Sequence, residues 1–287
     1  MGDIPLKDKT LPLYIMDFNT YIARVTNKKT AKTYTSLYNN HLISFDVNGK
    51  IDKSYIKDIN EYILALNKSA STKKAIYSLL VNITTQEPLK KKWKTLQDQF
   101  DVLKLKEQKE RMKMKADVLP NKREVIQFMN EQYKLEQYKS FIVNFLLLYY
   151  NVRNKDLVIE FVKTTKEATD QTKNYFIVRK NDIVYLRNAY KTADVYGTKK
   201  FTLKSKKLQE ASTAVMDSED PTLFNYEDTD HFTRNIGKLT FKNLNESDYT
   251  KIVLMSLDLS KHKDELKRIS SRRGTSVDLL LSTYKLN

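Results

Sequence analysis

The chain has 287 residues, which suits one large domain or two ordinary domains, and 40% of them are hydrophobic, which excludes global disorder. The formal net charge is +16, so we expect an anionic partner, either nucleic acid or an anionic membrane surface. There is no cysteine and there are only three histidines, which excludes disulfides and a cysteine nucleophile and argues against a metal site.

The sequence predicts no membrane segment. The longest apolar run, residues 141–150, is too short to span a bilayer. The first residues lack the apolar stretch of a signal peptide, and Leu6 breaks the N-myristoylation pattern. We therefore expect a soluble, intracellular protein with no membrane partner. Abundant Lys, Asn, Ile and Tyr with few glycines suggest an AT-rich genome, such as that of a virus or a mobile element.

Residues 11–115 are predicted to be all-helical. Apolar residues recur at helical spacing within 13–25, 30–41, 56–66 and 75–83, and Ser71-Thr72 is expected to cap the last helix. Any one lysine here could be ordinary solvated surface. As a set, however, lysines at the helix ends predict contact with a phosphate backbone; they are Lys28, Lys29, Lys32, Lys73 and Lys74.

The chain changes character after this bundle. Residues 104–115 form a charged run with little apolar periodicity, which indicates an exposed linker, either irregular or helical. Pro120 then opens a new pattern. We therefore divide the chain into a helical basic domain at 1–104, a charged linker at 105–119 and a second domain at 120–287.

The second domain is predicted to be mainly helical with a small antiparallel sheet, so the fold class is α+β. Strongly apolar residues 138–150 form a buried helix that ends just before Arg153 and Asp156-Leu157. Three strands are expected at 175–178, 183–190 and 201–203. The connection between the last two strands contains Lys191, Lys199 and Lys200.

The C-terminal part continues with a helix at 205–218, an acidic loop at 221–230, and a loop followed by a helix within 239–254. Apolar spacing then predicts a helix, a turn at Gly274 and a second helix that contains Tyr284.

These features resemble the catalytic domain of the tyrosine recombinase (phage integrase) family. In that family a buried helix ends in an arginine followed by an acidic residue and leucine, as at Arg153 and Asp156-Leu157. A Gly-His-Ser turn precedes the nucleophilic tyrosine, as Gly274-Thr275-Ser276 precedes Tyr284, with Thr275 in the place of the histidine.

The resemblance implies a role for each matching residue. Tyr284 would be the nucleophile that forms a 3′-phosphotyrosine, Arg153 would hold the phosphate with support from Asp156, and no cofactor is needed. The family's hairpin lysine, its general acid, matches Lys191 best, with Lys199 as the alternative. Residues 1–104 are loosely similar to the family's core-binding domain, so the two domains would clamp double-stranded DNA, with Lys199 and Lys200 adding contacts. A homo-oligomer on DNA is compatible with this reading.

The sequence departs from the family at the second arginine. His231 and Arg234 match its His-x-x-Arg motif, but Arg234 lies 50 residues before Tyr284, too far away, and 235–240 is expected to be a turn. The better register places Ser247 at the histidine and Thr250 at the arginine. Two guanidinium groups normally neutralise the phosphoryl transition state, and each donor is worth about 10²–10³ in rate. Arg272 or Arg273 could compensate.

Three hypotheses follow. The first is a DNA-binding protein with a recombinase-like fold and a degenerate site, which binds or packages DNA. The second is an active tyrosine recombinase or type IB topoisomerase-like enzyme. The third is a basic structural protein, for example in a virion.

We expect the affinity for duplex DNA to fall steeply with salt, because phosphate contacts release counterions. An electrophoretic mobility shift assay over a salt series measures the slope. If no salt-dependent shift occurs, the structural-protein hypothesis is favoured instead.

Overall fold

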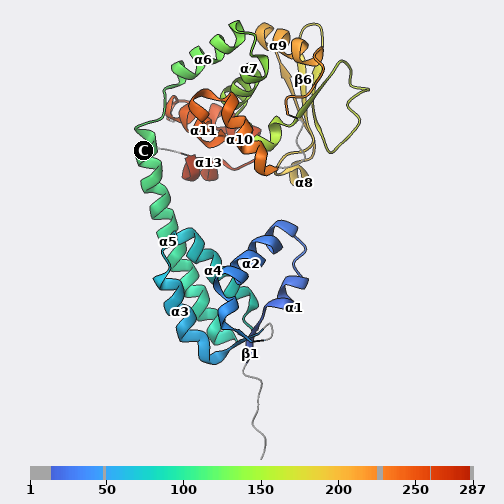
Figure 1. Ribbon diagram of the computed structural model, residues 1–287. Coiled ribbons are helices and arrows are strands. Elements are labelled where there is room, and N and C mark those ends of the chain that lie inside the picture. Colours follow the sequence, from blue (N-terminus) through green and yellow to red (C-terminus); the bar gives the residue numbers. More distant parts are fainter. Residues whose placement is uncertain (1–13, 48–49, 225–228, 259, 285–287) are drawn as a thin grey trace, which may run out of the picture. The chain divides into compact units, whose positions relative to one another are not determined.

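The computed structural model describes residues 14–47, 50–224, 229–258 and 260–284. Within these residues the chain is mainly helical with two small sheets, so the predicted α+β class is confirmed. The chain divides into two compact units, Met1–Met114 and Lys115–Asn287 (Figure 1). None of the helices in the described part combines the length and the apolar character needed to cross a membrane.

Unit 1 is a helical bundle with a short antiparallel sheet in the order β1-β3-β2. Its core includes the buried rings of Tyr77 and Trp93. Its elements are β1 (Tyr14–Asp17), α1 (Phe18–Ala23), α2 (Lys28–His41), η1 (Ile43–Phe45), β2 (Asp46–Val47), β3 (Lys50–Asp52), η2 (Lys53–Tyr55), α3 (Ile56–Ala65), α4 (Ala70–Ile83) and α5 (Glu87–Ala116).

Two details of the sequence prediction for unit 1 are wrong. The unit is not all-helical, because strands of two to four residues are too short to produce a recognisable alternation. The cap of α4 is Ser69 rather than Ser71-Thr72, since the Ser69 side chain accepts the backbone N–H of Thr72. The charged run at 104–115 belongs to the long helix α5.

Unit 2 combines a four-stranded sheet with helices. Its elements are α6 (Lys122–Lys134), α7 (Tyr138–Phe145), η3 (Leu146–Tyr150), η4 (Asn154–Leu157), β4 (Ile159–Val162), β5 (Asn174–Val178), β6 (Ile183–Arg187), α8 (Ala193–Tyr196), β7 (Lys199–Leu203), α9 (Lys206–Met216), α10 (Thr229–Leu239), η5 (Phe241–Asn243), α11 (Glu246–Met255), α12 (Lys263–Arg273) and α13 (Val277–Tyr284).

The sheet has the order β4-β5-β6-β7, and β4 runs parallel to β5. The prediction of a three-stranded antiparallel sheet is therefore wrong by one strand: β5, β6 and β7 are antiparallel neighbours, but β4 was missed. Its four residues directly follow η4 and are almost entirely buried, so no alternation marks them. Phe176 and Tyr185 face the main core, whereas Tyr175 and Val184 pack on the opposite side with Ala168.

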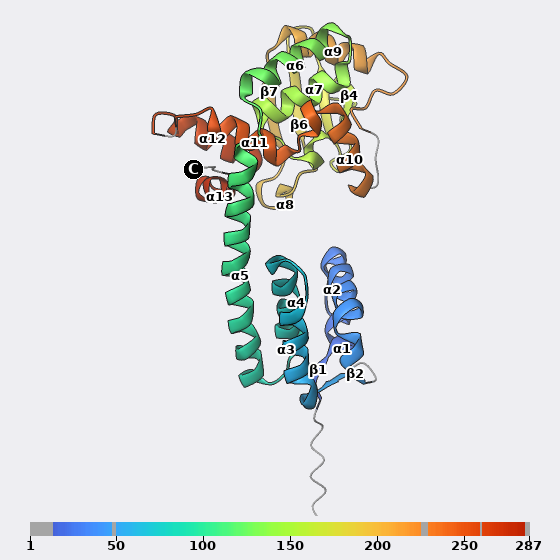
Figure 2. The same ribbon diagram turned by 60° about the vertical axis from the view of Figure 1, so that its left-hand side comes forward.

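The helix α7 occupies the centre of unit 2, packed against α6 and α9, and η3 packs against α11 (Figure 2). Its mainly apolar composition explains this position, because the apolar face of a helix must be buried, while Lys139 at its start pairs with Asp220. The segment 235–240 was expected to be a turn, but α10 runs to Leu239. Burial of Ile236 in the core offsets the helix cost of Gly237, about 1 kcal/mol. Within the acidic segment, residues 225–228 lie outside the described residues.

One buried ion pair ties three segments of unit 2 together. Arg187 Nη2 donates to Asp156 Oδ2 at 2.5 Å, and the two side chains are 1% and 0% exposed. Arg187 Nη1 also donates to the carbonyl oxygen of Arg272 at 2.7 Å. Strand β6, the turn η4 and the end of α12 therefore meet at one guanidinium.

We expect Arg187→Ala to lower the free energy of unfolding of unit 2 by about 3–5 kcal/mol, because it leaves Asp156 as an uncompensated buried charge. Urea unfolding followed by far-UV circular dichroism measures the loss. Trp93 is the single tryptophan and lies in the core of unit 1, so its fluorescence transition should not shift.

The control for this prediction is Arg179→Ala. Arg179 forms a partly exposed ion pair with Asp182 at 2.6 Å in the turn between β5 and β6, and its loss should cost less than about 1 kcal/mol. Equal losses for the two variants would contradict a special role for Arg187.

Candidate functional site

Tyr284 lies at the end of a helical hairpin formed by α12 and α13. Gly274 ends α12 in the left-handed conformation, with φ +61°, and the Thr275 N–H donates to the Ser270 carbonyl at 3.0 Å. Leu280 anchors α13 in the core. The predicted helix, glycine turn and helix is confirmed, and the turn directs α13 back along α12 so that Tyr284 meets the last residue of α12.

That last residue is Arg273, which is fully buried. Its Nη2 donates to the Tyr284 hydroxyl at 2.9 Å and to Glu246 Oε1 at 3.2 Å. Its Nη1 donates to Thr250 Oγ1 at 2.9 Å and to the Asn151 carbonyl at 3.0 Å. The guanidinium is thus held from both sides directly against the tyrosine hydroxyl, with its carbon 4.8 Å from the ring centre.

Arg153 is positioned by the end of the buried helix. Asn151 adopts a left-handed conformation after η3, which turns the chain, and the backbone N–H of Arg153 then donates to Asp156 Oδ2 at 2.8 Å. The Arg153 side chain is half-buried, and its Nη1 has no hydrogen-bond partner among the described residues. Asp156 therefore holds both the backbone of this turn and the side chain of Arg187.

The Arg153 guanidinium is electrostatically coupled to the tyrosine site. Burial, and next the charge of Arg273, lower the pKa of Arg153 from its ordinary value. Asp156, Glu246 and Tyr284 act in the opposite direction, so these groups lie within electrostatic range of Arg153. Arg273 thus contacts the Tyr284 hydroxyl directly, and Arg153 interacts with the same tyrosine electrostatically.

Lys199 also reaches this region. It begins β7 opposite Arg187 in the strand register, and its Nζ donates to the Ser271 carbonyl at 2.5 Å. The ammonium lies 5.1 Å and 5.3 Å from the ring centres of Tyr190 and Tyr196. Burial, and then the charges of Arg187 and Arg153, lower the pKa of Lys199 despite the opposing effect of Asp156. Lys191, by contrast, is exposed.

The connection between β6 and β7 packs on the glycine turn. A Cβ atom at Gly274 would overlap Thr192 Oγ1 and would come within 3.6 Å of Lys199 Nζ. Glycine is required here both for the positive φ and for this close approach. The contact fixes the position of Lys199 relative to the hairpin that carries Tyr284.

The other predicted residues have different positions. Arg272 donates to the Tyr149 carbonyl at 2.8 Å and pairs with Glu265 at 3.6 Å, so it links the end of α12 to η3. In unit 1, Lys73 donates to the Leu64 carbonyl and Lys74 pairs with Asp101.

Four further lysines that were predicted to bind DNA are exposed. They are Lys28, Lys29 and Lys32 in the first turns of α2, and Lys200 in β7.

Two residues that contact the candidate site, Glu246 and Arg187, were not predicted from the sequence. Glu246 lies one helical turn before Thr250, so the register of α11 places both on the same face. Arg187 is a charged residue at the end of an otherwise apolar, buried strand, which is an unusual position for an unpaired charge. Both signals can be seen in the sequence, but the residues that Glu246 and Arg187 contact, Arg273 and Asp156, are distant from them along the chain.

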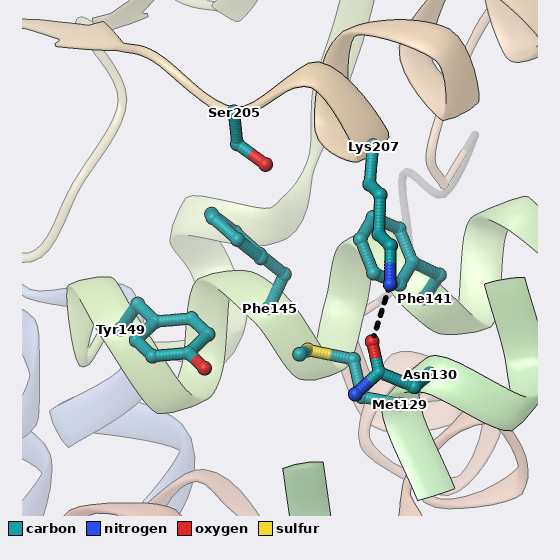
Figure 3. Close-up of a pocket in the computed structure, with 7 residues that line it drawn as sticks. All are labelled: Met129, Asn130, Phe141, Phe145, Tyr149, Ser205 and Lys207. Carbon is teal, nitrogen blue, oxygen red and sulfur yellow. Dashed lines mark hydrogen bonds between the residues drawn. The ribbon is translucent and has the colours of Figure 1, made fainter. Parts of the chain in front are cut away.

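The described residues also contain a cavity away from this site. It has a volume of about 260 Å³ and is lined mainly by apolar side chains of α6 and α7, including Met129, Phe141 and Phe145 (Figure 3). Lys207 crosses it to donate to Asn130 at 2.9 Å. None of the side chains around Tyr284 lines it, and among the described residues no group of His, Asp or Glu could hold a metal ion.

Neither a model of a known protein family nor a curated protein sequence matches the chain. Among solved structures, the crystal structure of XerA recombinase is similar, with 15% identity over 94% of this chain and 94% of that chain and a TM-score of 0.31. At this identity and TM-score the likeness carries no argument about activity, which must be inferred from the side-chain geometry.

We expect Lys199 to titrate below the ordinary lysine value of 10.5 in the folded protein, because burial and neighbouring cations disfavour its charged form. The free energy of unfolding should therefore rise as pH increases through the folded pKa towards the unfolded value. NMR of ¹³C-methylated lysines, assigned with Lys199→Met, measures the titration. Arg153→Gln should raise this pKa, and equal values in folded and urea-unfolded protein would contradict the expectation.

Proposed function

We propose that the protein binds duplex DNA and that unit 2 holds a phosphodiester against Tyr284 for strand cleavage and rejoining. The observation that carries this proposal is the buried Nη1 of Arg153, which has no partner among the described residues and lies within electrostatic range of Tyr284. A buried guanidinium donor without a partner is costly, and a phosphate oxygen is a ligand that guanidinium groups bind well.

The proposed reaction is a transesterification. The Tyr284 oxygen attacks phosphorus, the bond from phosphorus to the 5′ oxygen breaks, and a 3′-phosphotyrosine forms. The phenolic proton passes to water, and the leaving 5′ oxygen takes a proton from Lys199. Arg153 neutralises charge on a nonbridging oxygen as it grows. The reverse reaction rejoins the strand.

We prefer Lys199 over Lys191 as the general acid. A general acid works best when its pKa approaches the working pH, and burial with nearby cations lowers the pKa of Lys199 towards that range. Lys199 also contacts the hairpin of Tyr284 through the Ser271 carbonyl, whereas Lys191 is exposed.

Unit 1 is proposed to add contacts to the DNA backbone. The start of α2 supports this role best, because Lys28, Lys29 and Lys32 are exposed where the helix N-terminus also favours an anion. Lys73 and Lys74 already have partners within the unit. The domains at 1–104 and 120–287 would then share the duplex.

A second candidate function is DNA binding without cleavage. It is favoured by Thr275, a neutral residue where the resemblance would place a histidine, and by Thr250, where it would place an arginine. This candidate keeps the phosphate contact of Arg153 but predicts that Tyr284 is chemically silent.

Covalent trapping on a nicked suicide duplex tests the proposal. We expect the wild-type protein to form an adduct that resists denaturation, and Tyr284→Phe to form none while it binds the duplex equally well. Binding by the wild type without an adduct would favour the second candidate.

The same assay separates the two lysines. Lys199→Met should lower the rate of adduct formation by about 10²–10⁴, and Lys191→Met should leave it nearly unchanged. A substrate with sulfur at the 5′ bridging position should restore the Lys199→Met rate, since a thiolate leaves without a proton. The opposite pattern would assign the role to Lys191.

A further inference from the structure

We infer that Arg273 supplies a second guanidinium to the reacting phosphate and that Thr250 and Glu246 are the positioning residues that aim it. This inference rests on the proposed cleavage by Tyr284 and identifies how the site does without an arginine at position 250. The resemblance would place this charge on α11, at position 250, whereas Arg273 supplies it from the end of α12.

The burial of Arg273 is the first argument. A fully buried guanidinium costs several kcal/mol unless it is well paired, and here only one carboxylate, Glu246, contacts it at 3.2 Å. Its Nη1 and Nη2 make two hydrogen bonds each, whereas Nε has no partner among the described residues. Nη2 is the donor that contacts the Tyr284 hydroxyl, so the fixed guanidinium lies where it would stabilise negative charge that develops around that oxygen.

The charge of the whole cluster is the second argument. In the described part of unit 2, the cations that interact here are Arg153, Arg187, Arg273 and Lys199, and the carboxylates are Asp156 and Glu246. The cations exceed the carboxylates by two charges. A phosphodiester brings one negative charge, and attack by the phenol oxygen with loss of its proton adds another. The excess therefore matches the transition state better than the ground state.

Thr250 provides the space and the orientation for Arg273. It is fully buried on α11, and its hydroxyl donates to the Glu246 carbonyl at 3.0 Å. That bond fixes the side-chain rotamer and directs an oxygen lone pair towards Arg273 Nη1. A longer side chain at 250 would occupy the volume that the guanidinium now fills.

Glu246 couples the two guanidinium groups. Its Oε1 accepts from Arg273, and its Oε2 accepts from the backbone N–H of Asn154, the residue after Arg153. The Glu246 carboxylate therefore connects the Arg273 side chain to the turn that carries Arg153. The expected effect of its loss is on the rate of the chemical step rather than on DNA affinity.

An exchange of residues between the two helices tests the inference. Arg273→Thr should lower the single-turnover rate of adduct formation by about 10²–10³ with little change in DNA affinity. The double variant T250R/R273T returns a guanidinium to the same volume and should form the adduct at least about tenfold faster than Arg273→Thr alone. Arg268→Thr removes an exposed arginine of the same helix, which pairs with Glu265, and is the matched control, expected to react at the wild-type rate.

A methylphosphonate substrate keeps the test decisive if the double variant folds poorly. Replacing a nonbridging oxygen by methyl removes the charge that the second guanidinium neutralises. The defect of Arg273→Thr should then shrink to less than about tenfold, and so should that of Glu246→Gln, whereas a general structural defect would persist on both substrates.

Two failures are distinguishable. If the wild type forms no adduct, the proposed cleavage itself is overturned, and this inference with it. If the wild type reacts and Arg273→Thr reacts equally fast, or is equally impaired on both substrates, only the role of Arg273 is overturned.

Discussion

The arrangement of unit 2 depends on the buried contact between Arg187 and Asp156. Asp156 fixes the turn of Arg153 through a backbone hydrogen bond, and its own carbonyl accepts from the Tyr185 hydroxyl at 2.6 Å. Arg187 extends the connection to the Arg272 carbonyl and stands opposite Lys199 in the sheet. Sheet, turn and C-terminal hairpin are thus registered against one another by one ion pair. Hydrophobic packing alone, which is not directional, would leave that register less defined.

The site brings four cationic side chains together, two of them fully buried, and only two carboxylates interact with them. Aromatic rings also stabilise these cations. The Arg187 guanidinium lies 4.9 Å from the Tyr190 ring centre, and the Lys199 ammonium lies 5.1 Å from the same ring centre. Aromatic faces stabilise a cation without neutralising it, so the positive potential stays available to a ligand. This explains why tyrosines, rather than further acidic residues, surround Lys199.

Local sequence patterns predicted the parts of the site that local structure determines. The position of Arg153 after a buried helix and of Gly274 at a helix end could both be inferred from neighbouring residues, whereas support by Asp156 was implied only by the family resemblance. The approach of Arg273 to Thr250 joins α12 to α11, and no short-range pattern encodes it. The fold shows the same division, since the long apolar helix was recognisable, whereas β4 and α10 owe their structure to tertiary burial.

The packing of Arg273 against Thr250 has an evolutionary consequence. Both side chains are fully buried and in contact, so a single change to arginine at 250 would force two guanidinium groups into one volume. A single loss of Arg273 would leave the hydroxyl and Glu246 without their partner. The arrangement with arginine at 273 and an alternative with arginine at 250 are therefore separated by two substitutions that are each harmful alone, so the effects of changes at these two contacting positions should not be additive.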